Sequence, residues 1–308
     1  MNIMVPIAKI DQIDGYCQAG ADEFYFGFFD EKWDRKFGIF EEINRMSSFG
    51  SVANFDIRQI GEVVSVIKDK GKKAYLTLNS PIYSREQHYY IEYLICQGFF
   101  ERLDGLIIGD PCIIDLIKQT EIPIVLSTIA GGYNSLVVRF FRNMNIRRMI
   151  LPRDMQIQDI QKIVKNFSDI EFEVFLMRNG CKYSDAHCMS FHGRKHGAMC
   201  ACLDKSLLKL CLEDNISYEF SKEAYSNNKL FTKAFHKKAC GLCSIAAFYH
   251  MGIKSIKIVG RADEPERVKQ DIIHVKRIIS ALSEGKSSIE SLLNYDNCLY
   301  GLNCYYHL

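Results

Sequence analysis

Cysteine is the residue type with the clearest chemical potential in this sequence. The chain holds twelve cysteines, and in a reducing compartment such an excess of thiols indicates metal binding rather than disulfides. Most are crowded between residues 181 and 243 or lie in the tail: Cys181, Cys188, Cys200, Cys202, Cys211, Cys240, Cys243, Cys298 and Cys304. Cys17, Cys96 and Cys112 sit singly in apolar periodic segments, and we interpret them as buried core thiols. The crowded cysteines are the candidate metal ligands.

The spacing of these cysteines favours one kind of metal centre. A zinc ribbon uses two Cys-x-x-Cys pairs, whereas here only Cys240 and Cys243 have that spacing, and Cys181 is separated from Cys188 by a much longer interval. Wide and uneven spacing suits an iron-sulfur cubane better. Structural zinc, or a cysteine-rich packed loop without metal, stays open at this point.

The elements that must position these residues follow a regular alternation. Short β-branched or aromatic runs predict strands at residues 2–7, 23–28, 73–78, 105–109, 124–127, 148–151, 171–176 and 255–259. Amphipathic patterns predict helices at residues 10–19, 57–70, 85–101, 112–119, 134–144, 157–166, 243–251 and 264–283. Asp56, Asn134 and Pro265 are typical of helix N-termini. Eight βα units predict an α/β fold, a (β/α)8 TIM-like barrel.

One interval breaks this alternation. We divide the chain into barrel units 1–7 at residues 1–178, a Cys-rich insertion at 179–238, the last βα unit at 239–283 and a tail at 284–308. The loops that follow strand C-termini form the active face of such a barrel, so the insertion is expected over the barrel mouth. The tail, which is rich in tyrosine, is expected to pack on the barrel as an apolar strap.

Composition excludes several classes of protein. The 308 residues are 48% hydrophobic and 25% charged, which excludes a disordered or fibrous chain. Lys and Arg total 39 against 37 acidic residues, so no overall charge favours a nucleic-acid partner, although a local basic patch stays open. We expect no membrane span, because the apolar stretches are short. The N-terminus is typical of a strand rather than a signal peptide, which indicates a cytoplasmic protein.

Several segments resemble one known family along almost the whole chain. They are residues 20–27, 54–55, 71–79, 104–111, 126–128, 134, 138–141 and 150–154, and 251–261. The most specific is Glu171-Phe172-Glu173-Val174-Phe175 followed by Cys181 and Cys188, which is similar to a signature of peptidase family U32. That family includes collagenase-like peptidases, an anaerobic ubiquinone-hydroxylation pair and prephenate-dependent RNA-hydroxylation proteins.

The resemblance implies a barrel with a [4Fe-4S] cluster held by four cysteines. The implied ligands are Cys181, Cys188, Cys200 and Cys243, with Cys202 and Cys240 as the alternates for the last two. Two segments depart from the family pattern. Val259 stands where the family commonly has Glu, and residues 176–180 lack its common His-Gly. Both departures touch the expected substrate face.

The resemblance also implies a reaction class: oxygen-independent hydroxylation, or a related modification, of an aromatic or nucleobase-containing substrate, either a small molecule or RNA. Polar residues at expected strand ends would bind it: Asn79, Asp110, Ser127, Arg153 and Arg261. Arg153 and Arg261 could clamp a carboxylate. The alternatives are a peptidase, for which we find no nucleophile or zinc motif, and a non-catalytic subunit in a heterodimer with a second family member.

Overall fold

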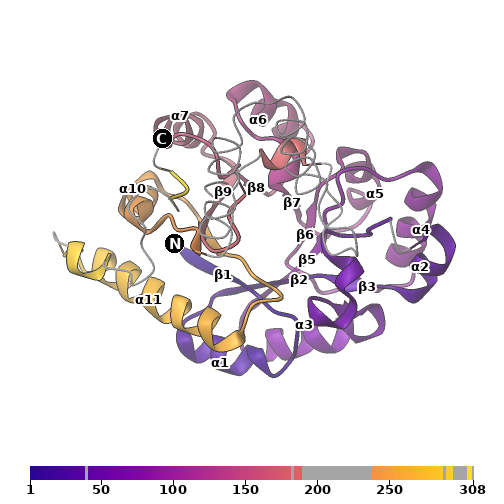
Figure 1. Cartoon of the computed structure of the whole chain (residues 1–308). Helices are drawn as coiled ribbons and strands as arrows, with labels where there is room; N and C mark the ends of the chain where they lie inside the picture. The colour runs from indigo at the N-terminus through magenta and orange to yellow at the C-terminus, as the bar shows by residue number, and fades with distance from the viewer. Residues whose placement is uncertain (39–40, 182–183, 189–237, 287–288, 294–303, 307–308) are drawn as a thin grey trace, which may run out of the picture.

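A closed barrel of parallel strands forms the centre of the molecule (Figure 1). The computed structural model describes residues 1–38, 41–181, 184–188, 238–286, 289–293 and 304–306. Within them, eight strands join in the order β1-β10-β9-β8-β7-β6-β5-β2. They are β1 Asn2–Pro6, β2 Glu23–Phe26, β5 Lys73–Leu78, β6 Gly105–Ile108, β7 Ile124–Leu126, β8 Arg148–Ile150, β9 Glu171–Met177 and β10 Ser255–Ile258. The predicted TIM-like barrel is confirmed, and each strand lies where the sequence predicts it.

Helices surround the barrel, as Figure 1 shows. They are α1 Gln12–Ala19, α2 Glu31–Phe37, α3 Ile60–Asp69, α4 Arg85–Cys96, α5 Ile114–Ile117, α6 Ser135–Arg142, α7 Ile157–Asn166, α10 Ile245–Met251 and α11 Pro265–Ser283. The expected N-terminal signals are confirmed, because Asp56 and Asn134 accept backbone hydrogen bonds and Pro265 opens α11. No helix among the described residues combines the length and apolarity needed to cross a membrane.

Two predicted helices are shorter than expected. The helix predicted at 85–101 ends at Cys96, and Gly98 then takes a left-handed φ of 76°, which glycine adopts at little cost. The helix predicted at 112–119 is a 3₁₀ turn at Pro111–Ile113 followed by the single turn of α5.

The sequence did not predict α2 or a small second sheet, in which β3 (Phe28–Phe29) pairs with β4 (Phe55–Asp56). Helix α2 is short and charged, and among its described residues only Trp33 is buried, so it has little apolar periodicity to detect. Trp33 packs against Phe37 and Tyr90, with ring centroids 4.6 and 5.7 Å away. Trp33 thus serves packing between α2 and α4.

The interpretation of the three isolated cysteines as buried core thiols is wrong for Cys96 and Cys112 and only partly confirmed for Cys17. Cys17 is half-buried, but Cys96 and Cys112 are exposed. Cys96 is the last residue of α4, and Cys112 lies in the 3₁₀ turn whose start is capped by Asp110. Apolar neighbours in the sequence do not reveal which side of a helix end faces solvent, and this misled the prediction.

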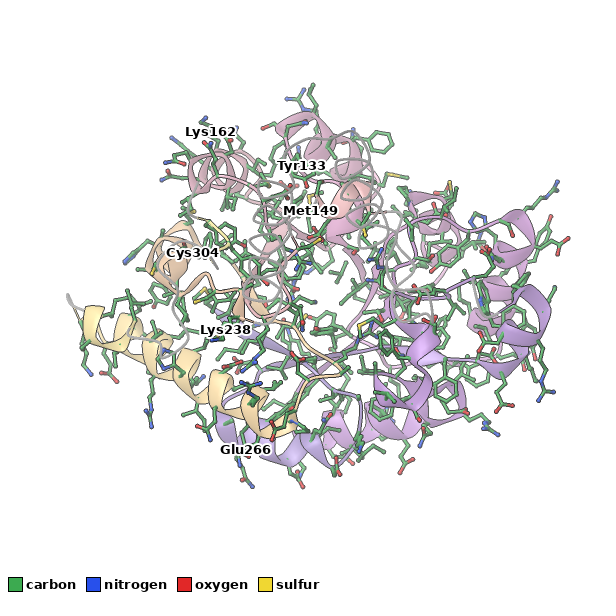
Figure 2. The ribbon with its side chains drawn as sticks, in the orientation of Figure 1. Tyr133, Met149, Lys162, Lys238, Glu266 and Cys304 are labelled. Carbon is green, nitrogen blue, oxygen red and sulfur yellow. The ribbon has the colours of Figure 1, made fainter. Side chains whose placement is uncertain are left out.

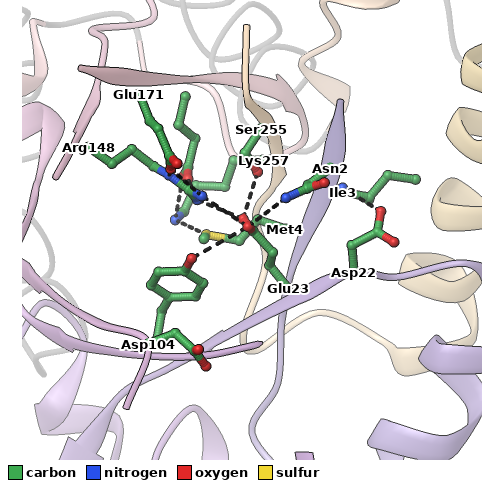
Figure 3. Close-up of polar contacts among 12 residues, drawn as sticks. Asn2, Ile3, Met4, Asp22, Glu23, Asp104, Arg148, Glu171, Ser255 and Lys257 are labelled. Carbon is green, nitrogen blue, oxygen red and sulfur yellow. Dashed lines mark hydrogen bonds and ion pairs between the residues drawn. The ribbon is translucent and has the colours of Figure 1, made fainter. Parts of the chain in front are cut away.

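The barrel interior contains a network of buried charges at the N-terminal ends of the strands (Figure 3). The guanidinium of Arg148 on β8 lies 2.6 Å from a carboxylate oxygen of Glu23 on β2 and 3.1 Å from one of Glu173 on β9. Glu173 also pairs at 3.0 Å with Lys257 on β10. All four residues are at most 5% exposed. Because each charge has a partner, the interior can hold them at tolerable cost.

Neutral groups complete this network. Ser255 and Asn2 donate hydrogen bonds to Glu23 at 3.0 and 2.8 Å. Burial alone would raise the pKa of Glu23, but the hydrogen bonds and charge of Arg148 outweigh burial and lower it. Glu23 is therefore ionised at neutral pH and ties strands from both halves of the barrel together.

We predict that Glu23→Gln costs about 3–5 kcal/mol of unfolding free energy at neutral pH, because it leaves Arg148 with an uncompensated part of its charge. The contribution of Glu23 is fully present above the pKa of an unfolded glutamate and is lost as pH falls through the lowered folded pKa. The difference between wild type and variant should therefore shrink in acid. Urea unfolding at several pH values measures this difference in unfolding free energy.

Glu31→Gln, which breaks an exposed pair with Arg35, is the control and should change the unfolding free energy little. Equal effects of both substitutions would contradict the prediction.

Candidate functional site

The C-terminal end of the barrel carries the five polar residues expected to bind substrate, and each follows a strand: Asn79, Asp110, Ser127, Arg153 and Arg261. Three of them hold loops. Asn79 accepts a hydrogen bond from the backbone of Arg45 at 3.1 Å. Asp110 accepts one from the backbone of Tyr83 and caps the turn at Pro111, and Ser127 caps the turn at Thr128–Ala130. These contacts shape the loops at the barrel mouth.

Arg153 has a partner of its own. Its Nε and Nη2 atoms lie 2.7 and 3.1 Å from the two carboxylate oxygens of Asp185, and its Nη1 donates to the carbonyl oxygen of Asn179 at 2.5 Å. The guanidinium also stacks over the Phe175 ring at 4.2 Å. Burial by itself lowers the pKa of Arg153, but Asp185 outweighs burial and raises it. Because Asp185 occupies its planar edge, Arg153 does not share a carboxylate clamp with Arg261 in this conformation.

Arg261 has a different environment. Its Nη1 donates to Asn54 Oδ1 at 2.8 Å, Asn44 Oδ1 at 3.3 Å and Thr77 Oγ1 at 3.4 Å, and its Nη2 donates to the carbonyl oxygen of Arg45. All these acceptors are neutral. Residues 44–54, which follow β2 and β3, thereby join the end of β10.

The exit from β9 is held in an unusual backbone conformation. Arg178 and Asn179 both have positive φ values, 67° and 48°, which non-glycine residues rarely adopt. Three contacts fix the turn: the side chain of Arg178 pairs with buried Asp271, Asn179 donates to Asp263 at 3.0 Å, and Arg153 binds the Asn179 carbonyl. This turn directs the chain toward Cys181.

Two of the predicted ligands, Cys181 and Cys188, follow this turn, and both are half-buried. Arg45 Nη2 donates to the sulfur of Cys188 at 3.1 Å. Cys181 lies near enough to Arg153 for their charges to interact. Ligation needs the thiolate form, and an adjacent guanidinium stabilises negative charge on sulfur. The chemistry of this donor set fits a metal centre that takes thiolate ligands.

The Cys-x-x-Cys pair lies on the chain segment that leads into α10. Cys243 is exposed, whereas Cys240 is buried, its backbone pairs with Met177 at the end of β9, and its sulfur accepts a hydrogen bond from the Leu242 amide at 3.4 Å. Cys304 forms a backbone bridge with Cys240, and Figure 2 shows it beside α10.

The described part of the tail packs on the barrel as expected. Tyr306 donates to the carbonyl oxygen of Phe175 at 2.9 Å, its ring packs on Phe248 of α10, and Tyr305 donates to the carbonyl oxygen of Arg178.

The remaining predicted ligands, Cys200 and Cys202, lie outside the described residues. Among the residues that the structure does describe, no three His, Cys, Asp or Glu side chains form a metal-binding group. The ligand set therefore stays a prediction.

Sequence reasoning missed Arg45, Asn44, Asn54 and Asp185, which complete the environment of the predicted residues. No periodicity or spacing marks them, because they are brought in by the irregular segment between α2 and β4 and by the turn at Asp185–His187.

A comparison with protein families identifies the chain. The model of peptidase family U32 matches residues 8–300. The chain belongs to peptidase family U32. The family predicted from the signature around β9 is thus confirmed.

Named relatives in this family differ in description. The chain is 34% identical over 93 residues to tRNA hydroxylation protein P of Escherichia coli (strain K12), covering 30% of this chain and 19% of that protein. It is 23% identical over 315 residues to a protein named collagenase from Porphyromonas gingivalis, covering 96% of this chain and 70% of that protein. The match to tRNA hydroxylation protein P of Haemophilus influenzae, 32% identical, covers 40% of this chain and 26% of that protein. The matched region thus spans about a fifth to a quarter of these two hydroxylation proteins.

Solved structures also match the chain, at low sequence identity. A U32 peptidase structure has a TM-score of 0.43 at 11% identity, covering 57% of this chain and 69% of that chain. N-acetylneuraminate lyase from Mycoplasma synoviae has a TM-score of 0.47 at 8% identity, covering 94% of this chain and 78% of that chain.

We predict that Asp185→Asn loosens the segment that carries Cys181 and Cys188, because Asp185 neutralises Arg153 and accepts from Thr128 at 3.3 Å. Removing one partner of a buried pair costs about 3–5 kcal/mol. Hydrogen exchange should show faster exchange of the Cys188 amide, which bonds to the Asp185 carbonyl. Asp154→Asn, which removes a carboxylate bonded to Tyr133 but not to Arg153, is the control. Unchanged exchange in Asp185→Asn would refute this role.

Proposed function

We propose that this U32 chain carries a [4Fe-4S] cluster at the C-terminal end of its barrel and takes part in oxygen-independent hydroxylation, or a related modification, of an aromatic or nucleobase-containing substrate. The relatives named tRNA hydroxylation protein P support the reaction class and make RNA one candidate substrate, beside a small molecule. Structural zinc is the alternative cofactor.

One observation carries the proposal: the hydrogen bond from Arg45 Nη2 to Cys188 Sγ at 3.1 Å. Arg45 reaches this thiol from the segment between α2 and β4, and a cysteine that serves only packing needs no such cation. Hydrogen bonds and positive charge directed at ligand sulfurs are the means by which proteins set the potential of an iron-sulfur centre. The contact therefore supports Cys188 as a metal ligand rather than as a packing residue.

The proposed ligands are Cys181, Cys188, one of Cys200 and Cys202, and one of Cys240 and Cys243. Burial favours Cys240 over Cys243 for the fourth place, although the family resemblance implies Cys243. Cys240 is joined to the end of β9, from which Cys181 also departs. The amide hydrogen bond to its sulfur is of the kind that orients thiolate ligands.

The chain's own residues have clear tasks in such a site. When bound, the [4Fe-4S] cluster would supply one-electron chemistry at the barrel mouth. Arg45 would hold the sulfur of Cys188 in place and stabilise its charge. Arg153 and Asp185 would fix the segment from Asn179 to Cys188, and the described tail residues Tyr305 and Tyr306 cover the end of β9.

Two other functions are possible for a member of this family: a peptidase, or a non-catalytic subunit of a heterodimer. The relative named collagenase matches along most of this chain, and its name is the observation that favours proteolysis. The sequence, however, holds no nucleophile or zinc motif of the kind that peptide hydrolysis requires. Product formation by this chain alone, compared with activity only after a second family member is added, would separate an enzyme from a subunit.

We predict that the chain purified without oxygen holds about four irons and as many sulfides, as a cubane requires. Cys181→Ser and Cys188→Ser should lose nearly all the iron, and Cys240→Ser should lose more than Cys243→Ser. Cys96→Ser and Cys112→Ser, which alter exposed cysteines far from this set in the sequence, are matched controls and should retain it. One firmly bound zinc in place of iron, or full iron in Cys188→Ser, would refute the proposal.

We also predict that Arg45→Gln lowers the reduction potential of the cluster while leaving the iron content near that of wild type. The guanidinium stabilises the more negative reduced state, so its removal makes reduction harder. Potentiometric titration followed by electron paramagnetic resonance measures the change. Arg35→Gln, which removes an exposed guanidinium on α2, is the control. An unchanged potential in Arg45→Gln would show that the hydrogen bond to Cys188 has no electronic role.

A further inference from the structure

The buried arginines of this barrel differ in one respect. Arg148, Arg153 and Arg178 each pair with a carboxylate, from Glu23, Asp185 and Asp271 respectively. Arg261 forms no ion pair with any carboxylate of the described residues, although it is only 7% exposed. Burying a cation without a counter-ion costs free energy. Such a cost is typical of a residue that is retained for function rather than for stability.

The groups around Arg261 are arranged to face a cation but not to neutralise one. The side-chain nitrogens of Asn44 and Asn54 donate to the backbone carbonyls of Phe28 and Met46, which turns both side-chain oxygens toward Arg261. The hydroxyl of Thr77 donates to the Phe26 carbonyl at 3.1 Å and is oriented in the same way.

Longer-range charges do not restore the balance. Burial is the largest influence on Arg261 and lowers its pKa to about 10, while Tyr25 and Glu42 act in the opposite direction. The positive charge of Arg45 lowers the pKa further. Two positive charges therefore lie near each other, and within the described parts of the chain no carboxylate pairs with Arg261, so a negative group would stabilise it.

The backbone near Arg261 leaves room for its guanidinium. A side chain at Gly27, directly after β2, would place its Cβ 1.7 Å from Arg261 Nη1 and 2.3 Å from Asn54 Oδ1. Only glycine fits at this position. Arg261 follows β10, and the residues that surround it follow or end β2, β3 and β5, so the cation stands at the C-terminal end of the barrel. Barrel enzymes bind their ligands at this end.

We propose that Arg261 and Arg45 form an anion subsite at the barrel mouth, which binds the carboxylate or phosphate group of a small ligand. The planar guanidinium of arginine matches both groups. A small ligand fits better than a nucleic-acid backbone, because Arg261 is almost enclosed and a polyanion is bound by exposed cations. The inference rests on the proposed function for the assumption that a substrate or co-substrate binds at this end.

The test uses three probes that share one ring: benzoate, phenyl phosphate and the neutral benzyl alcohol. Calorimetric titration of the full chain should show binding of at least one anion and none of the alcohol. Binding of benzoate alone identifies a carboxylate site, and binding of phenyl phosphate alone identifies a phosphate site. Arg261→Gln should weaken that binding by at least about tenfold, and Arg261→Lys should retain part of it. Arg35→Gln is the surface control.

The outcomes separate this inference from the proposed function. Retained iron with lost anion binding in Arg261→Gln supports the subsite independently of the cluster. Wild-type protein that binds an anion but holds no iron would leave the subsite standing and remove the cluster. Failure of both anions to bind wild type up to millimolar concentration, or equal binding by Arg261→Gln, would overturn the subsite. If Arg261→Gln does not fold, Arg45→Gln is the deciding variant, and unchanged binding there overturns the proposal.

Discussion

The contact between Arg148 and Glu23 is the interaction on which the arrangement of this barrel depends. It joins β8 to β2 across the interior, and Glu173 extends the same network to Lys257 on β10. Strands that are far apart in the sequence are thereby tied at their N-terminal ends. These charges therefore neutralise one another at the N-terminal end of the barrel.

Charge is treated differently at the two ends. At the N-terminal end of the strands, Arg148 is matched by carboxylates, and its role is structural. At the C-terminal end, Arg153 is matched by Asp185 and fixes the segment that carries the predicted cysteine ligands. Arg261, by contrast, meets only neutral acceptors among the described residues. Among the residues that the structure describes, Arg261 therefore keeps an unneutralised positive charge at the end of the barrel where barrel enzymes bind their ligands.

The segment after β9 links these features. Its backbone is held with positive φ at Arg178 and Asn179, which costs free energy that the contacts to Asp271, Asp263 and Arg153 offset. The turn leads directly to Cys181 and then to Cys188, whose sulfur meets Arg45. The carbonyl oxygen of Arg45 also accepts a hydrogen bond from Arg261. Arg45 therefore contacts both the proposed cluster ligand Cys188 and its partner in the proposed anion subsite.

The sequence by itself determined the barrel, the family and the candidate thiols. Strand periodicity and caps such as Asp56 and Asn134 are local signals, and the spacing of Cys181 and Cys188 after Glu171–Phe175 is a property of the chain alone. Only the tertiary structure decided that Cys96 and Cys112 face solvent, that Arg153 is occupied by Asp185, and that Arg45, Asn44 and Asn54 surround Arg261. The physical reason is that an unpaired charge is defined by what lies next to it in space, and those neighbours come from loops without periodicity.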